Sequence, residues 1–149
     1  MSTRVIKTEA DRALLIQYLK ARPLPYTVDI VKGKRRSVEQ NKLNRLWIAE
    51  IAEQLGDQTP EHVRGFCKLT MGVPILRAEN TLFRERYDAV VRPLPYETKL
   101  ALMQEPIDLP VTRLMTTDQE HRYLEAVCQF FVERGIVLTD PEGKQRKAA

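Results

Sequence analysis

The stretch from Ser37 to Leu55 constrains the fold more than any other part of this sequence. It opens with Ser37-Val38-Glu39-Gln40, in which the serine hydroxyl can accept from the amide of Gln40 while the Gln40 side chain reaches back. Gly56 follows it, and glycine is typical of the position just after a helix. The sequence therefore predicts a long helix over residues 37–55, against which the rest of the chain must pack.

One face of this predicted helix carries two amides in line with the only tryptophan. Its members follow one another at spacings of three and four: Gln40, Asn44, Trp47, Ile51 and Leu55. A buried amide left unpaired costs about 1–3 kcal/mol, so both amides must bond to backbone, water or a ligand. Capping would satisfy Gln40, whereas Asn44 lies beyond the cap. For Trp47, core packing is the preferred interpretation over stacking on a ligand.

Other capping and breaking residues predict further helices. Thr8 with Asp11 begins one over 8–21, and Thr59-Pro60 begins another that runs to about residue 69. Residues 79–91 and 96–104 also have helical character. A last helix is expected from Thr117, where Thr117-Asp118-Gln119-Glu120 has the form of a capping box, to Gly135.

The segment Tyr26–Lys32 alternates between apolar and polar residues, which predicts a half-buried strand. Arg4–Lys7 is a candidate partner strand, and Met71–Leu76 is read as a loop or a short strand. Together these elements predict an α+β fold: a single mixed domain over residues 1–142 with a short antiparallel sheet and several helices. Residues 143–149 are expected to form a polar, basic, disordered tail.

Length and composition favour one ordinary globular domain. The chain has 149 residues, of which 43% are hydrophobic and 30% charged. No apolar run has the length of a membrane span, and the first residues lack the apolar core of a signal peptide. We therefore expect a cytoplasmic protein. Cys67 and Cys128 are expected to be reduced, small, buried hydrophobes, although a disulfide is the alternative.

The basic residues are clustered. The net charge is only +4, but one cluster precedes and enters the long helix and a second lies in the tail: Lys32, Lys34, Arg35, Arg36, Lys42 and Arg45, then Lys144, Arg146 and Lys147. Such clusters suggest a surface that faces a polyanion. On charge alone, a solvated turn and a disordered tail explain them equally well.

The sequence offers no conspicuous set of catalytic residues. His62 and His121 are far apart, and neither has zinc-ligand spacing to a cysteine. There is no glycine-rich phosphate loop. A metal site that pairs Asp29 with Glu39 or Asp88 has little support, because carboxylates are common. We therefore expect a protein that is not an enzyme and needs no cofactor or metal.

Basic side chains, amides and an aromatic ring meet where the long helix begins, and this combination suits phosphate and base recognition. The candidate DNA-binding residues are Lys32, Lys34, Arg35, Arg36, Ser37, Gln40, Asn41, Asn44, Arg45 and Trp47.

Two parts of the chain resemble the Orf/NinB family of lambdoid phages. One is the extended segment that ends in Arg36-Ser37-x-x-Gln40-Asn41, with Leu46-Trp47 following; the other combines Thr112–Thr117 with Phe131–Asp140. The middle, from about residue 69 to 110, does not align. Carried over residue by residue, Arg36, Ser37, Gln40 and Asn41 form the candidate site. The family's tryptophan usually follows the Gln-Asn pair by four positions, and Arg45 occupies that place here. Arg45 is therefore a candidate contact to the DNA strand in place of Trp47.

The resemblance implies a phage- or prophage-encoded recombination mediator that acts in the bacterial host cell. Such a protein is a homodimer of mixed α/β fold that prefers single-stranded DNA. It works beside the host single-strand binding protein and helps to load an annealing protein or recombinase. Two alternatives stay open: a metal-dependent nuclease that acts on recombination intermediates, and a protein–protein adaptor that works through an apolar stripe from Leu124 to Phe131.

Overall fold

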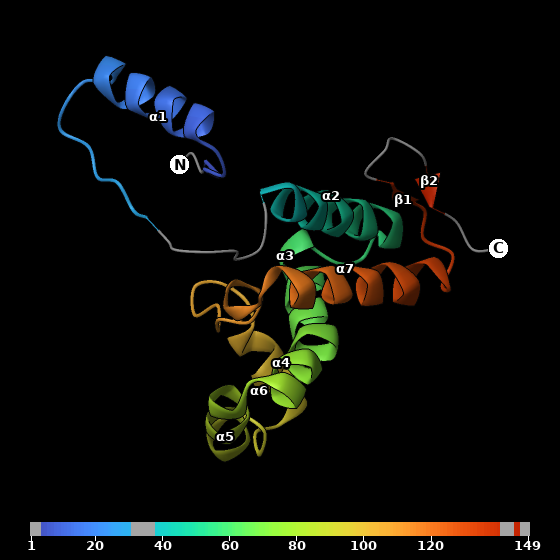
Figure 1. Ribbon diagram of the computed structural model, residues 1–149. Helices are drawn as coiled ribbons and strands as arrows, with labels where there is room; N and C mark the ends of the chain where they lie inside the picture. The colour runs from blue at the N-terminus through green and yellow to red at the C-terminus, as the bar shows by residue number, and fades with distance from the viewer. Residues whose placement is uncertain (1–3, 31–37, 141–144, 147–149) are drawn as a thin grey trace.

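The protein is mainly helical in the computed structural model, which describes residues 4–30, 38–140 and 145–146 (Figure 1). The elements in chain order are α1 (Glu9–Ala21), α2 (Val38–Leu55), α3 (Pro60–Cys67), the π-helix η1 (Lys68–Gly72), α4 (Val73–Glu79), α5 (Thr81–Val90), α6 (Tyr96–Leu102), the 3₁₀ turn η2 (Thr112–Leu114), α7 (Thr117–Val132), β1 (Leu138–Thr139) and β2 (Gln145–Arg146).

The predicted α+β class with its antiparallel sheet is wrong. Among the described residues the strands are two residues long each, and β1 pairs with β2 in antiparallel register. Residues 26–30 have no strand structure, nor do residues 4–7, and positions 31 and 32 of the predicted strand lie outside the described residues. Alternation shows which side chains of an extended segment share a face, but a strand also needs a neighbour to receive its backbone hydrogen bonds. In Figure 1 no other described segment runs beside this one.

The helix ends follow local chemistry and match the sequence closely. Thr8 and Asp11 form the predicted capping box of α1, and Thr59 caps α3. Gly56 ends α2 at a φ of 81°, in the left-handed region that favours glycine. The capping box of α7 lies one residue earlier than predicted: the hydroxyl of Thr116, rather than that of Thr117, accepts from the amide of Gln119, and the Thr116 amide donates to the Gln119 side-chain oxygen.

Residues 60–79 are helical without a break, so the loop or short strand predicted over 71–76 is wrong. The amide of Val73 donates to the carbonyl of Lys68, five residues back, which is the widened π pattern. Pro74 has no N–H to donate and enters at the first turn of α4, where the missing donor is tolerated. The proline therefore changes the hydrogen-bond pattern of the helix without ending it.

Helices α2 and α7 lie side by side and run in the same direction (Figure 1). At their beginnings, the Gln40 amide donates to the carbonyl of Thr117. At their far ends, Gln54 exchanges two hydrogen bonds with the backbone of Val137, just beyond α7. Both helix N-termini therefore lie at one end of the molecule.

The hydrophobic core fills the space between these two helices and the layer of α3, η1 and α4. Its largest fully buried side chains include Trp47 from α2, Leu76 from α4 and Tyr123 from α7. Cys67 and Cys128 are buried and free, as the small-hydrophobe interpretation predicted. Burial raises the pKa of the Cys67 thiol to about 12, so this thiol stays protonated at neutral pH.

Helix α1 stands apart from this core. Figure 1 shows it held away from the other helices on an extended segment, and none of its residues is buried. Its few stabilising contacts come from its own neighbourhood: Tyr26 donates to the carbonyl of Leu19, and the guanidinium of Arg4 lies over the ring of Tyr18. We call residues 4–30 the arm and residues 38–140 the body.

Candidate nucleic-acid interface

The amide and tryptophan face of α2 points inward. Gln40 is half-buried and donates to the carbonyl of Thr117 across 3.1 Å. Trp47 is 1% exposed, and its indole nitrogen donates to the carbonyl of Thr139 at 2.6 Å. Ile51 is fully buried. This face therefore holds α2 against α7 and β1, and Trp47 has almost no surface on which a base could stack.

Asn44 differs from the other members of this face. Its residue is half-buried, and its side-chain oxygen is buried without a hydrogen-bond donor among the described residues. A buried acceptor of this kind costs free energy unless something donates to it. Asn44 is one turn from Gln40, so the acceptor lies near the end of α2 where the basic segment of the chain enters.

The outward face of α2 carries the cations. Lys42 and Arg45 are both exposed and are three residues apart, so their side chains are neighbours on the helix surface. Within the described part of the chain neither forms an ion pair. Asn41 lies between the two faces and is half-buried. These three residues are the predicted contacts that the structure places where a ligand can reach them.

The remaining predicted contacts lie outside the described residues: Lys32, Lys34, Arg35, Arg36 and Ser37. They directly precede Val38, the first residue of α2, so in sequence they join the end of the body that carries Lys42 and Arg45.

A further cation at this end was not predicted. Arg113 is exposed on η2, which leads directly into α7, and the start of α7 is tied to the start of α2 by the Gln40–Thr117 bond. Arg113 lies at this end because α2 and α7 pack side by side. Residue spacing in the sequence does not predict that packing, so Arg113 was not among the predicted contacts.

Two parallel helix N-termini give this end of the body a positive potential. Each presents backbone N–H groups that have no partner within the helix, and such groups attract anions. Acidic residues in the first turns offset part of this potential: Glu39 in α2, and Asp118 and Glu120 in α7. Glu120 is buried, and Asp118 pairs with Arg122. Within the described residues, Glu39 is the exposed carboxylate of this set that forms no ion pair. The exposed cations Lys42, Arg45 and Arg113 outnumber it.

The most buried charged cluster lies elsewhere and holds a loop in place. Lys68 is 2% exposed and donates to Asp108 at 2.5 Å and to the carbonyl of Met103 at 2.9 Å. Arg64 bridges the same Asp108 oxygen to Glu61. Burial lowers the pKa of Lys68, while its partners oppose that shift. Every charge in this cluster has a partner, and its function is to fix the segment after α6 to α3 and η1.

The structure does not assemble the weak metal site considered from the sequence. Asp88 lies on α5 and forms an ion pair with Arg77 at 2.7 Å, and α5 lies away from α2, the helix that carries Glu39 (Figure 1). Among the described residues, no group of three His, Cys, Asp or Glu side chains is arranged to hold a metal.

The apolar stripe proposed as an adaptor surface belongs to the core. Leu124, Val127, Cys128 and Phe131 are all buried. Phe130, the half-buried member of the stripe, lies between two surface hollows. In the described part of the chain, no helix has the length and apolar character needed to cross a membrane.

Comparisons of the chain with models of protein families, with curated proteins and with solved structures find no match in any of the three.

Proposed function

We propose that this protein binds single-stranded DNA at the end of the body where α2 and α7 begin, and that it acts as a recombination mediator. The single observation that carries the proposal is the exposed position of Lys42 and Arg45 beside two helix N-termini, where neither forms an ion pair with another described residue. Four more cations lie in the segment of sequence that leads into α2. The resemblance to the Orf/NinB family adds the choice of single strands. It also adds the expected setting: a homodimer, the host single-strand binding protein and a recombinase or annealing protein.

The exposed residues of this surface contact the DNA, and the buried ones position α2. Lys42, Arg45 and Arg113 hold phosphates through charge. Asn41, at the edge of the same surface, offers an amide to a sugar or base edge. Gln40 and Trp47 act indirectly, because they hold α2 in register with α7 and β1.

The test is fluorescence anisotropy with a labelled single strand and a matched duplex across a salt series. The site variant is Lys42→Ala/Arg45→Ala. Its control is Arg84→Ala/Arg86→Ala, which removes the same charge from exposed positions on α5, a helix that packs against α4 and lies away from α2 in Figure 1. We expect tighter binding to the single strand than to the duplex. Loss of two phosphate contacts lowers the logarithmic salt slope by roughly 1.4.

An equal loss of affinity in both double variants would show that overall charge, rather than this surface, governs binding. The proposed position of the DNA-binding site would then be wrong. No binding to either DNA at low salt would remove the function. Incubation of the same DNA with Mg²⁺ tests the nuclease alternative, since cleavage that disappears with EDTA would replace the mediator assignment.

A further inference from the structure

The C-termini of α2 and α7 give their end of the body a negative potential. The two helices run side by side in the same direction, and Gln54 at the end of α2 exchanges hydrogen bonds with Val137 just beyond α7. The C-terminal end of a helix carries a partial negative charge, and neither helix has a basic residue in its last turn. This end therefore favours a cation, whereas the end where the two helices begin favours an anion.

A hollow of about 360 Å³ opens where these two helices end. Leu55, the last residue of α2, lines it together with Phe130 and Phe131 from the last turn of α7. Phe66 from α3 and Tyr96 from α6 add two further rings to its wall. We call this space the Tyr96 hollow. Its volume is within the range of small-molecule sites, which is about 300–1,000 Å³.

The aromatic wall of the Tyr96 hollow suits a cation. The centroid of the Phe66 ring lies 5.5 Å from that of Phe130 and 6.2 Å from that of Phe131, and Tyr96 is 49% exposed. The face of an aromatic ring is electron-rich and attracts positive charge. The chain already contains one such contact, because the guanidinium of Arg134 lies 3.5 Å from the centroid of the Phe130 ring. Within the described part of the chain, no arginine or lysine lies over Phe66 or Tyr96.

The charge on the wall of the hollow is also negative. Glu97 is its one carboxylate among the described residues, and no lysine or arginine of that part of the chain lines it. Glu97 is exposed and forms no ion pair with another described residue. A primary ammonium would lose the water on its three N–H donors against apolar rings, whereas a quaternary ammonium has no N–H to satisfy. The hollow therefore favours a quaternary ammonium over other cations.

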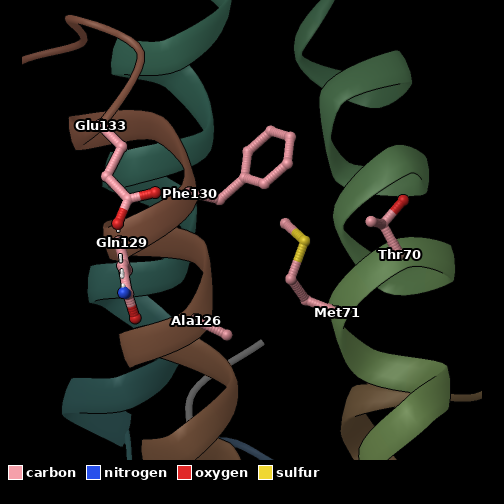
Figure 2. Close-up of a pocket in the computed structure, with 6 residues that line it drawn as sticks. All are labelled: Thr70, Met71, Ala126, Gln129, Phe130 and Glu133. Carbon is pink, nitrogen blue, oxygen red and sulfur yellow. Dashed lines mark hydrogen bonds between the residues drawn. The ribbon is translucent and has the colours of Figure 1, made fainter.

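The neighbouring hollow, between η1 and α7, lacks this combination (Figure 2). Phe130 is the one aromatic residue among the described residues that line it, and Met71 faces that ring across the hollow. Its carboxylate, Glu133, accepts a hydrogen bond from the Gln129 amide at 3.1 Å. Glu133 is thus an exposed carboxylate close to the same helix end but outside the aromatic wall, and it supplies a matched control.

We propose that the Tyr96 hollow binds a quaternary ammonium group, the chemistry that choline and trimethyllysine share. The rings of Phe66, Tyr96 and Phe130 contact the methyl groups, and Glu97 balances the charge. The inference goes beyond the proposed function, because the hollow lies at the other end of α2 and α7 and its ligand is not DNA.

The test is an NMR titration of the full-length chain with choline and with its tert-butyl analogue, in which a neutral carbon replaces the nitrogen. The backbone amide signals of Tyr96 and Glu97 should shift and saturate with choline, which should bind roughly tenfold more tightly than the analogue. A short peptide that contains trimethyllysine is the second probe. Tighter binding of the peptide would identify a protein as the source of the group, and tighter binding of choline a free small molecule.

Two substitutions separate the contributions of ring and charge. Tyr96→Leu keeps an apolar side chain but removes the ring, and Glu97→Gln removes the charge. Each should weaken choline binding by roughly fivefold. The control variant Glu133→Gln, in the neighbouring hollow, should leave the affinity unchanged.

Three results would overturn the proposal. Equal affinities for choline and the tert-butyl analogue would show that the hollow recognises apolar shape rather than charge. An equal loss of affinity in Glu97→Gln and Glu133→Gln would show that overall charge attracts the ligand. The third is the absence of amide shifts with both choline and the peptide.

Discussion

The indole nitrogen of Trp47 donates a hydrogen bond to the carbonyl oxygen of Thr139, 2.6 Å away, and so joins the middle of α2 to the strand that follows α7. Glu50, one turn along α2, accepts from both the amide and the hydroxyl of the same Thr139. One turn further, the Gln54 amide donates to the carbonyl of Val137 and accepts from its N–H. One face of α2 thus satisfies the backbone of residues 137–139 in the way that a neighbouring strand would.

Trp47→Phe should destabilise the fold without a direct effect on DNA binding. The substitution keeps most of the ring but removes the donor, which leaves the carbonyl of Thr139 without this bond. The expected loss is roughly 2 kcal/mol of unfolding free energy. Urea unfolding followed by circular dichroism measures it, because Trp47 is the only tryptophan and fluorescence is lost with it. Tyr96→Phe, at an exposed ring, is the control. If Trp47→Phe kept its stability but bound single-stranded DNA more weakly, Trp47 would have to contact the DNA directly.

The helix ends were predictable because their signals are local. Thr8 with Asp11, Thr59 before Pro60, and Gly56 act within one turn of the positions they govern. The predicted strand is wrong over residues 26–30, because alternation does not show whether a partner segment exists. The helix over residues 71–76 was predicted as a loop or short strand, because the π pattern of η1, which leads the helix into Pro74, has no local signal in the sequence.

The candidate site was predictable only in part, for a related reason. Helical spacing correctly grouped Gln40, Asn44 and Trp47 on one face, but spacing does not say whether a face meets solvent or another helix. The packing of α7 against α2 decides that, and it turns the amides inward and leaves Lys42 and Arg45 outside.

Asp108→Asn should destabilise the loop after α6 in a pH-dependent way. Asp108 has a φ of 51°, a region that asparagine also adopts, so the substitution removes charge with little backbone strain. It removes the negative charge beside the buried Lys68 ammonium, which then has only neutral acceptors such as the Met103 carbonyl. The expected cost at neutral pH is roughly 2–3 kcal/mol. Asp118→Asn is the control, because that carboxylate is exposed and Arg122 keeps Glu79 as a partner.

The pH dependence of this variant follows from the pKa of Asp108. Burial by itself raises that pKa, but the hydrogen bonds from Lys68 and Arg64 outweigh it and hold the pKa below its ordinary value. A carboxyl with a lowered folded-state pKa contributes stability above its ordinary pKa and loses that contribution as the pH falls through the lowered value. The gap between wild type and Asp108→Asn, measured by urea unfolding from pH 7 to pH 2, should therefore narrow only below about pH 4. A gap that stays constant down to pH 2 would contradict a charge-based role.

Gly72→Ala and Gly65→Ala should differ in cost although both replace a helical glycine. A Cβ at Gly72 would lie 2.7 Å from Val111 Cγ1 and 3.4 Å from the Tyr123 ring, both in the packed core. A Cβ at Gly65 would lie 2.7 Å from Cγ of Gln104, so this half-buried side chain would have to turn about its Cα–Cβ bond and give up its hydrogen bond to the Leu100 carbonyl. Overpacking should cost Gly72→Ala roughly 1–3 kcal/mol. At Gly65 the helix propensity of alanine, worth about 1 kcal/mol, offsets the displacement of Gln104. Thermal and urea unfolding of the two variants measure the difference. Equal stabilities would show that the π-helix segment yields to the new methyl group, and that the core beside Gly72 is looser than its contacts indicate.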